Sequence, residues 1–432
     1  MGKFISRTIT IGVVLYGICF VTCNFYDAKN IEDTQTNKIN QNNNMLSMML
    51  ETDSGSGQYE MTSLSSWPTD GYVFNSELSK CENGSKLSWD ETNKQVVFSG
   101  IITDKCYVYF DVISSVALAD YVISQYTGIQ GENNIYYHDS NLTNGAGDNS
   151  YRYAGANPNN YVCFGSDDAT CPHENLYRII GLIDGKVKLI LADGATTTML
   201  GTDEGYVDTY QAALVSASSY YKGNGDLTKI GTYKWNKSGT NTWSTSTTNT
   251  RNLNTNYLTY LDSKNTKWKT MIDDTTWYVG GMASTNGVES NAKTAYDYEV
   301  GANKDATTTV ISKIGMMYVS DYYYAASKDY WTLPGYNSSG NDYSKAVNDN
   351  WLYTGLYECT ISRRSDSFVS EFVVHGSGSV GDDDVGNSNG NVARPSFSLS
   401  SSIKFTSGEG TDVNPIRIQL WIHFINCVFY EI

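Results

Sequence analysis

One stretch decides the fold, and it reads Asn175-Leu176-Tyr177-Arg178-Ile179-Ile180-Gly181-Leu182-Ile183-Asp184-Gly185-Lys186-Val187-Lys188-Leu189-Ile190-Leu191-Ala192. Its two apolar runs flank an Asp-Gly pair, which is the strongest short-range signal for a β-hairpin. In the second run we expect Val187, Leu189 and Leu191 to point inward, and Lys186, Lys188 and Ile190 to lie opposite them. We interpret the hairpin as the founding piece of a C-terminal domain that closes near Arg394-Pro395-Ser396-Phe397, with Ile179 and Phe397 packed together.

The composition favours an extracellular β-rich protein. The chain has 432 residues, enough for two or three domains, and a net charge of −16. Nucleic acid and anionic membrane surfaces are therefore poor partners. Charged residues make up only 18%, whereas tyrosine alone counts 34. Surfaces rich in Tyr, Ser, Gly and Asn are typical of exposed sheets, and also of binding loops.

The first residues carry an export signal. Lys3 and Arg7 precede the apolar run Ile9 to Phe25, which is a positive region followed by a hydrophobic one. An uncleaved signal anchor is the first interpretation, with a cleaved signal peptide and lipidation of Cys23 as alternatives. The positive end is then cytoplasmic and the remainder exported to the cell surface.

Four cysteines fall into two local pairs, Cys81 with Cys106 and Cys163 with Cys171. In an exported chain, pairs of this kind predict disulfides. A zinc site would need clustered Cys-x-x-Cys motifs or nearby histidines, and the four histidines have no such spacing. We therefore expect no bound metal and no cofactor.

The chain divides into segments of different character, and the predicted class is α+β. The expected order is a signal anchor, a disordered stalk, a small cystine-stapled β unit, a connecting helix with loops, a C-terminal domain and an apolar tail. Their predicted bounds are 1–26, 27–66, 67–112, 113–174, 175–415 and 416–432. We expect strands at 313–320 and 392–399, and loops at 321–326 and 376–391.

Three blocks resemble a known family: Gly71 to Asp111 with its two cysteines, Asn175 to Gly181, and Lys313-Ile314-Gly315 through Thr360-Ile361-Ser362 to Ala393-Arg394-Pro395-Ser396-Phe397. Together they are similar to exported proteins of low-GC Gram-positive gut bacteria. The resemblance implies a C-terminal domain of the formylglycine-generating-enzyme-like branch of the C-type-lectin-like fold. The family pattern has Trp where this chain has Cys359, and the residues after Ile416 extend past the usual end.

Candidate binding residues form one aromatic cluster, Tyr322, Tyr323, Tyr324, Trp331 and Trp351. Aromatic side chains in loops stack on sugars or hold protein partners, although they also fill cores. Arg394 is predicted to be structural, tying the last strand to carbonyls or a carboxylate. Asp382-Asp383-Asp384 is either a solvated loop or a Ca²⁺ site, and the solvated loop is preferred.

No catalytic constellation stands out. The enzyme branch of the resembled fold uses two late cysteines, whereas Cys359 lacks a positioned partner. His375 lies at a glycine-rich edge and is expected to be solvated rather than a catalytic base. The sequence thus predicts a non-enzymatic cell-surface adhesion or binding protein for a glycan or protein ligand. The alternatives are an extracellular hydrolase of carbohydrate or peptidoglycan and a structural envelope component.

Overall fold

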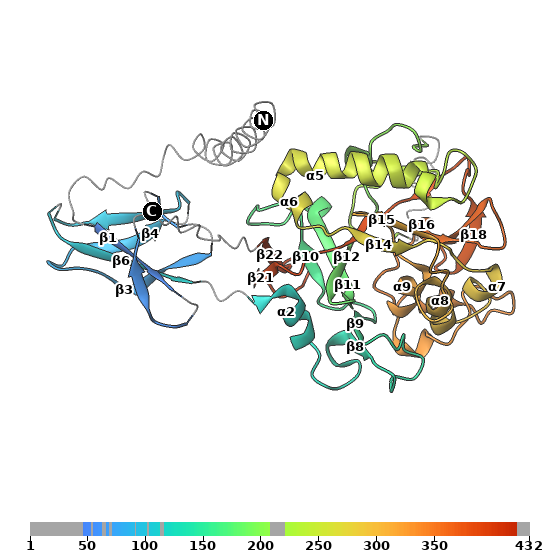
Figure 1. The fold of residues 1–432 in the computed structure, drawn as a ribbon, viewed down its shortest axis with the longest axis horizontal. Coiled ribbons are helices and arrows are strands. Elements are labelled where there is room, and N and C mark those ends of the chain that lie inside the picture. The colour runs from blue at the N-terminus through green and yellow to red at the C-terminus, as the bar shows by residue number, and fades with distance from the viewer. Residues whose placement is uncertain are drawn as a thin grey trace, which may run out of the picture. The chain divides into compact units, whose positions relative to one another are not determined.

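The computed structural model describes residues 46–52, 55–62, 66–68, 71–90, 92–101, 103–112, 116–207 and 221–420. The predicted signal anchor, the first part of the stalk and most of the apolar tail lie outside these residues. Within them, no helix combines the length and the apolar character needed to cross a membrane. The chain forms two compact units, Met1–Ser115 and Val116–Ile432, and both are drawn in Figure 1. The class is mixed α+β with more strand than helix, as predicted.

The first unit is a small β structure. Its strands are β1 (Leu46–Glu51), β2 (Tyr59–Met61), β3 (Tyr72–Cys81), β4 (Lys86–Asp90), β5 (Gln95–Ser99) and β6 (Cys106–Val112). One sheet has the order β2-β1-β6-β3, and β4 pairs with β5 in a separate hairpin. Met48, Val108 and Phe110 form a small core with Trp89 and other partly buried side chains.

The start of this unit differs from the prediction. The stalk was expected to run to residue 66, but 46–51 and 59–61 are strands. β1 pairs in parallel with β6, and Met48 lies opposite Val108. Leu46 and Leu50, two residues to either side of Met48, pack against the same small core, which is the period of a strand. The Met-rich segment therefore belongs to the sheet and supplies a core side chain.

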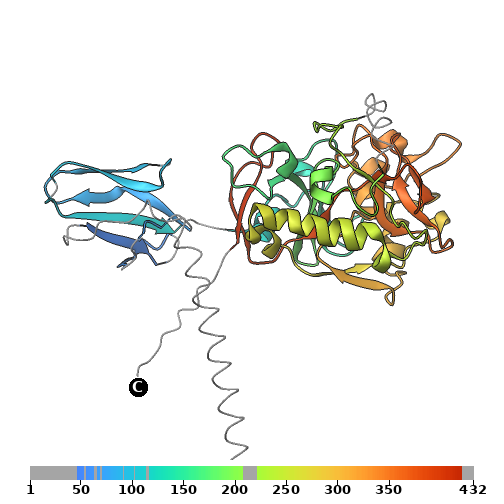
Figure 2. The same cartoon turned by 90° about the horizontal axis from the view of Figure 1, so that it is seen from above.

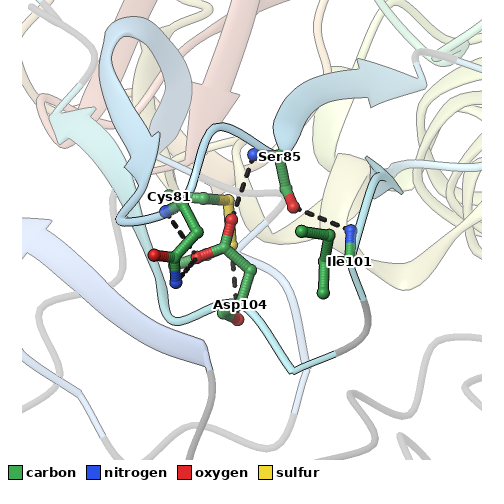
Figure 3. The surroundings of a disulfide bond; sticks show 6 residues. Cys81, Ser85, Ile101 and Asp104 are labelled. Atoms are coloured by element: carbon green, nitrogen blue, oxygen red, sulfur yellow. Dashed lines mark hydrogen bonds between the residues drawn. A yellow bond between two sulfur atoms is a disulfide. The ribbon is translucent and has the colours of Figure 1, made fainter.

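The predicted Cys81–Cys106 disulfide is present and joins β3 to β6 at a directly paired position. Figure 3 shows how the neighbouring turn is held. The Asp104 carboxylate accepts hydrogen bonds from the Asn83 and Ser85 amides at 2.8 and 3.0 Å. Ser85 Oγ in turn accepts one from the Ile101 amide at 2.9 Å. The disulfide and these bonds tie the β4–β5 hairpin to the sheet of a unit with a very small core.

The second unit starts well before the predicted boundary at residue 175. Its strands are β7 (Val116–Ala117), β8 (Ile135–His138), β9 (Ser150–Tyr153), β10 (Tyr161–Cys163), β11 (Leu176–Ile183), β12 (Lys186–Leu191), β13 (Thr232–Tyr233), β14 (Thr275–Tyr278), β15 (Thr309–Ser312), β16 (Glu358–Arg363), β17 (Ser370–Val374), β18 (Val380–Asp384), β19 (Asn391–Val392), β20 (Ser396–Ser398), β21 (Ile403–Ser407) and β22 (Arg417–Leu420). The segment 113–174, predicted to be a connecting helix with loops, contains helix α2 (Leu118–Ser124), and it also supplies β8, β9 and β10 to the main sheet. Residues 417–420, assigned to the tail, pair with β21.

The helices of this unit are short, except for one long helix formed by η6 and α5. They are α2 (Leu118–Ser124), α3 (Thr197–Leu200), η6 (Thr248–Tyr257), α5 (Leu258–Lys264), α6 (Thr266–Thr270), α7 (Ser284–Gly287), α8 (Ala292–Glu299) and α9 (Val319–Tyr324), with single turns η1 (Glu132–Asn134), η2 (His173–Asn175), η5 (Trp243–Thr245), η7 (Lys328–Tyr330) and η8 (Tyr343–Ala346). Figure 2 shows η6 and α5 as one continuous helix. Its buried face includes Leu253, Tyr257 and Leu261.

The main sheet contains the predicted hairpin and has the order β20-β12-β11-β9-β8, with β10 also paired to β11. The turn between β11 and β12 is Asp184-Gly185, and both residues have positive φ, 51° and 73°. This matches the twist that a two-residue hairpin needs. Leu189 pairs with Ile179 on one side and with Phe397 on the other. The opening hairpin therefore lies beside the closing strand, as predicted, and β12 separates Ile179 on β11 from Phe397 on β20.

Other strands form smaller sheets in the same unit. The closing part of the chain builds the order β13-β19-β16-β17-β18, while β14 pairs with β15 and β21 lies between β22 and β7. Two expectations are wrong here. Only an isolated bridge at Gly315 appears in the predicted strand 313–320, and residues 319–324 form helix α9 rather than a loop.

Candidate functional site

The predicted aromatic cluster is part of the core. Tyr322, Tyr323, Tyr324, Trp331 and Trp351 are at most 6% exposed. Their polar atoms bond to backbone carbonyls: for example, Tyr322 Oη donates to Gly378 O at 2.9 Å and Trp351 Nε1 to Tyr153 O at 2.9 Å. A helix in place of the expected loop turns three successive tyrosines into the interior. The cluster therefore fills the core, which was the preferred interpretation of these aromatic residues, and it does not form an exposed contact surface for a ligand.

The other residues singled out by sequence also have structural surroundings. Arg394 is buried, pairs with Glu358 at 3.2 Å and donates to the carbonyls of Leu191 and Leu352, as predicted. The Cys163–Cys171 disulfide is present. Cys359 is buried with its thiol 3.6 Å from Glu371 Oε1, and burial raises its pKa well above the usual value.

The acidic run and the predicted solvated histidine differ from expectation. Asp382, Asp383 and Asp384 belong to strand β18 rather than to a loop. Asp382 pairs with Arg364 at 2.7 Å. His375 is partly buried, and burial lowers its pKa. In the described ranges, no three or more His, Cys, Asp or Glu side chains gather in a way that could hold a metal ion.

A different group of residues lines a cavity of about 410 Å³ beside the founding hairpin. We call it the Lys188 cavity. Its lining combines charged residues, aromatic residues and hydroxyls from β9, β12, β14, α8, α9 and β20. These residues include Asp148, Arg152, Asp184, Lys186, Lys188, Asp274, Thr275, Trp277, Tyr278, Tyr296, Lys304, Tyr318, Ser320, Asp321 and Ser398.

The main sheet places the cations of this cavity in register. Gly181 at the middle of β11 pairs with Arg152 on β9 and with Lys188 on β12. Lys188 in turn pairs with Ser398 on β20. Residues paired across a sheet project to the same face. A Cβ atom at Gly181 would lie 2.2 Å from the Tyr151 carbonyl oxygen, so β9 and β11 approach each other more closely at this point than a residue with a side chain would allow.

Asp321 from α9 bridges Lys188 and Arg152. Its Oδ2 accepts a hydrogen bond from Lys188 Nζ at 2.6 Å, and its Oδ1 accepts one from Arg152 at 3.3 Å. Arg152 also donates to Asp148 Oδ2 at 2.9 Å. Lys188, Asp321 and Arg152 are all at most 6% exposed. The result is a buried chain of alternating charges, Lys188–Asp321–Arg152–Asp148, along one wall of the cavity.

Local structure holds Asp321 in this position. It stands in the first turn of α9, and its carboxylate also accepts the Tyr318 amide at 2.9 Å. Glu299 at the end of α8 accepts the next two amides, Val319 and Ser320, both at 2.9 Å. These amides have no partner inside their own helix. The two carboxylates together fix the helix start that presents Asp321.

Aromatic rings surround the charges. The Lys188 ammonium lies 4.8 Å from the Tyr318 ring centre and 5.4 Å from that of Trp277. The Arg152 guanidinium lies 5.6 Å from the ring of Tyr296, whose hydroxyl donates to Asp148. Cation–ring contacts of this kind are strongest when desolvated. They offset part of the cost of burying the cations.

The electrostatic state of the chain follows from these contacts. Despite its own desolvation, Asp148 has a lowered pKa, because Arg152 and Ser150 stabilise the carboxylate. The Lys188 ammonium carries three N–H groups, and Asp321 is its only hydrogen-bond acceptor among the described residues. The Lys188 ammonium, at one end of this row of charges, therefore retains N–H donors that can bind a ligand oxygen in the cavity.

Sequence reasoning missed this site because Lys188 was treated as the outward face of β12. Every residue from Val187 to Leu191 is buried, since α9 and β14 cover that face. The available signal was Lys188 itself, because a lysine at the centre of an otherwise apolar strand indicates a buried charge. Asp148 and Arg152 lay in a segment that gave no periodic pattern.

Comparison with known proteins adds no identity to this geometry. No family model, no curated protein and no solved structure matches the chain.

Proposed function

We propose that this chain is an exported, non-enzymatic binding protein of the cell surface, and that its second unit binds a neutral carbohydrate in the Lys188 cavity. The observation that carries the proposal is the buried, charge-balanced chain Lys188–Asp321–Arg152–Asp148 in the cavity wall. The C-type-lectin-like fold implied by the sequence resemblance belongs to the same proposal. The two disulfides support an oxidising, extracellular location.

The charge balance of the cavity favours a neutral ligand. Its lining has four acidic residues, Asp148, Asp184, Asp274 and Asp321, and four basic ones, Arg152, Lys186, Lys188 and Lys304. This balance stands out in a chain with a net charge of −16. Lys188, Arg152 and Lys186 each pair with a carboxylate, so an anion would meet a like charge beside three of the four cations.

The mixture of groups suits hydroxyl-bearing molecules. Each sugar hydroxyl both donates and accepts hydrogen bonds, and the lining offers an ammonium, carboxylates and the hydroxyl of Ser398. The walls contributed by Trp277, Tyr278 and Tyr318 supply apolar contact beside polar tips. The volume lies within the range of small-molecule sites.

Hydrolysis fits the same cavity less well. A glycosidase needs one carboxyl group that stays protonated and one that is ionised. Asp148 has a lowered pKa. Glu299 has a raised pKa, but it is buried outside the lining and both of its oxygens accept backbone amides. Binding without turnover is therefore the better supported function.

The test is calorimetric titration of the purified full chain with neutral oligosaccharides, preceded by a glycan array that includes acidic sugars. Lys188→Met should weaken binding at least about tenfold, a loss of about 1.4 kcal/mol. The matched control Lys237→Met removes an exposed lysine outside the cavity and should bind as the parent does.

A second variant tests the same cavity if Lys188→Met does not fold. Ser398→Val replaces the Ser398 hydroxyl by two methyl groups beside Lys188 and suits a β-strand, so it should also weaken binding. A folded chain that binds no saccharide would overturn the proposal. Equal binding by the parent and both cavity variants, or exclusive binding of acidic sugars or amino acids, would do the same.

A further inference from the structure

A second cavity adjoins the Lys188 cavity and has a volume of about 520 Å³. We call it the loop cavity, because the segment 139–147 forms one side. Its other side comes from α8 and the turn that follows, through Lys293, Tyr296, Asp297, Gly301 and Ala302. Nothing in the proposed function so far uses it.

The two cavities meet at Tyr296, which lines both. Its hydroxyl donates to Asp148 Oδ2 at 3.1 Å on the side of the Lys188 cavity. Lys293 lies over its ring on the side of the loop cavity, 5.6 Å from the ring centre. A single side chain therefore stands between the two spaces.

The backbone after α8 follows the same division. Val300 and Lys304 line the Lys188 cavity, whereas Gly301 and Ala302 line the loop cavity. One turn of chain thus contributes to both walls within five residues. The two spaces are neighbours along a common edge, formed by Tyr296 and residues 300–304.

The loop cavity is shaped before any ligand arrives. Tyr324 Oη donates to the Asn144 carbonyl at 3.1 Å, and the Ala146 amide donates to His138 Nδ1 at 3.0 Å. Leu142 is buried beneath the loop. Preformed loops reduce the entropy lost on binding. Exposed Ser140 and Thr143 offer hydroxyls on this fixed frame.

The charges of the loop cavity also favour a neutral ligand. Lys293 pairs with Asp297, and Asp139 is the remaining charged residue of the lining. The two cavities together therefore carry six acidic and five basic side chains. The two totals differ by one, so a chain of neutral units that passes Tyr296 meets nearly balanced charge on both sides.

We propose that the Lys188 cavity and the loop cavity are consecutive subsites for one linear neutral oligosaccharide, with a sugar unit on each side of Tyr296. This inference rests on the proposed function and names its ligand as a chain rather than a single sugar. The tyrosine is the partition against which both units pack. Lys188 anchors the first unit, and Lys293 with the 139–147 loop contacts the second.

The experiment compares ligand length with two cavity variants. Calorimetry of the full chain uses α-1,4-linked glucose oligomers and β-1,4-linked N-acetylglucosamine oligomers of one to six units. In the parent, the longer oligomers of the series that binds should exceed the single sugar by at least about tenfold in affinity. Ala302→Trp fills the loop cavity from an exposed turn, and Lys293→Ala removes a contact.

Both variants should bind the single sugar as the parent does and lose most of the gain with length. Ala306→Trp, on the same exposed loop but outside both cavities, is the matched control and should retain the gain. Equal affinity for all lengths would overturn the two-subsite inference and leave the proposed function intact. Equal losses at every length in the variants would also overturn it. Absence of binding to every oligomer would overturn the proposed function itself.

Discussion

Glu299 gives the sharpest prediction about stability, because its carboxyl group is buried behind the Lys188 cavity without a cationic partner in the structure. It accepts the amides of Val319 and Ser320, and Ser362 Oγ donates to it. Burial raises its pKa from 4.5 to about 7. The perturbation is Glu299→Gln, which removes the ionisable proton and keeps the size of the side chain.

The sign follows from proton linkage. Below pH 4.5 Glu299 is protonated in both states, so it adds no pH dependence. Between pH 4.5 and 7 the unfolded chain releases the proton and the folded chain keeps it, so stability falls as pH rises. Above pH 7 both states are ionised and the fall stops. The pKa difference of about 2.5 corresponds to roughly 3 kcal/mol.

Glu299→Gln removes this pH dependence of the unfolding free energy, but the substitution also destabilises the folded state in another way. The glutamine oxygen can accept one backbone amide, while its NH₂ group cannot accept the other. A buried amide without a partner costs about 1–3 kcal/mol. We therefore expect Glu299→Gln to be less stable than the parent at pH 5, and the difference to shrink or reverse by pH 8.

Urea unfolding at pH 5, 6, 7 and 8, followed by tryptophan fluorescence, measures this difference. Subtracting the variant from the parent removes the contributions of other buried groups, such as His138, whose lowered pKa acts in the opposite direction. A difference in unfolding free energy that stays constant from pH 5 to 8 would refute the reasoning, because Glu299 would then have the same pKa in both states.

Three further predictions concern single groups. Thr275→Val should stabilise the second unit by about 1 kcal/mol in thermal unfolding, because Thr275 Oγ1 is buried without a hydrogen-bond partner in the described structure. As a control, Thr309→Val at an exposed position of the neighbouring strand should change the stability little. Cys359 should resist iodoacetamide in the native protein and react in urea, as read by peptide mass spectrometry, because it is buried with a raised pKa; labelling of the native thiol would contradict this. Replacing Cys81 and Cys106 by serine should cost the first unit about 3–4 kcal/mol, from a loop separation of 25 residues, and calorimetry should show the transition of the second unit unchanged.

The parts of the fold that follow local rules were predictable from sequence. The Asp184-Gly185 hairpin depends on turn chemistry and apolar alternation within eighteen residues, and both disulfides depend on near neighbours in the chain. The domain was expected to close with residues 394–397 packed against the hairpin, and β12 does pair with β20 through Leu189 and Phe397. These features depend on signals that a few adjacent residues carry.

Contacts between segments that are far apart in the sequence could not be predicted in the same way. The burial and pairing of Lys188 depend on α9, which supplies Asp321, 133 residues later in the chain. The Tyr-rich segment 322–324 has no strong helix preference, and its helix is fixed by capping from Asp321 and Glu299. Likewise, Met48 is a core residue only because β6 lies beside it. In each case tertiary partners decided the outcome.

The cost of the Lys188–Asp321–Arg152–Asp148 chain is itself an argument for a binding role. Replacing buried ion pairs by apolar residues is often neutral or stabilising, and the row at Arg152, Gly181 and Lys188 lies in a sheet otherwise rich in Ile, Leu and Val. An apolar row would have served packing alone. A row that keeps two cations, pairs both with Asp321 and opens on a cavity serves a polar ligand better than it serves the core. The two-cavity arrangement around Tyr296 extends the same logic, because a packed interior gains nothing from a partition with space on both sides.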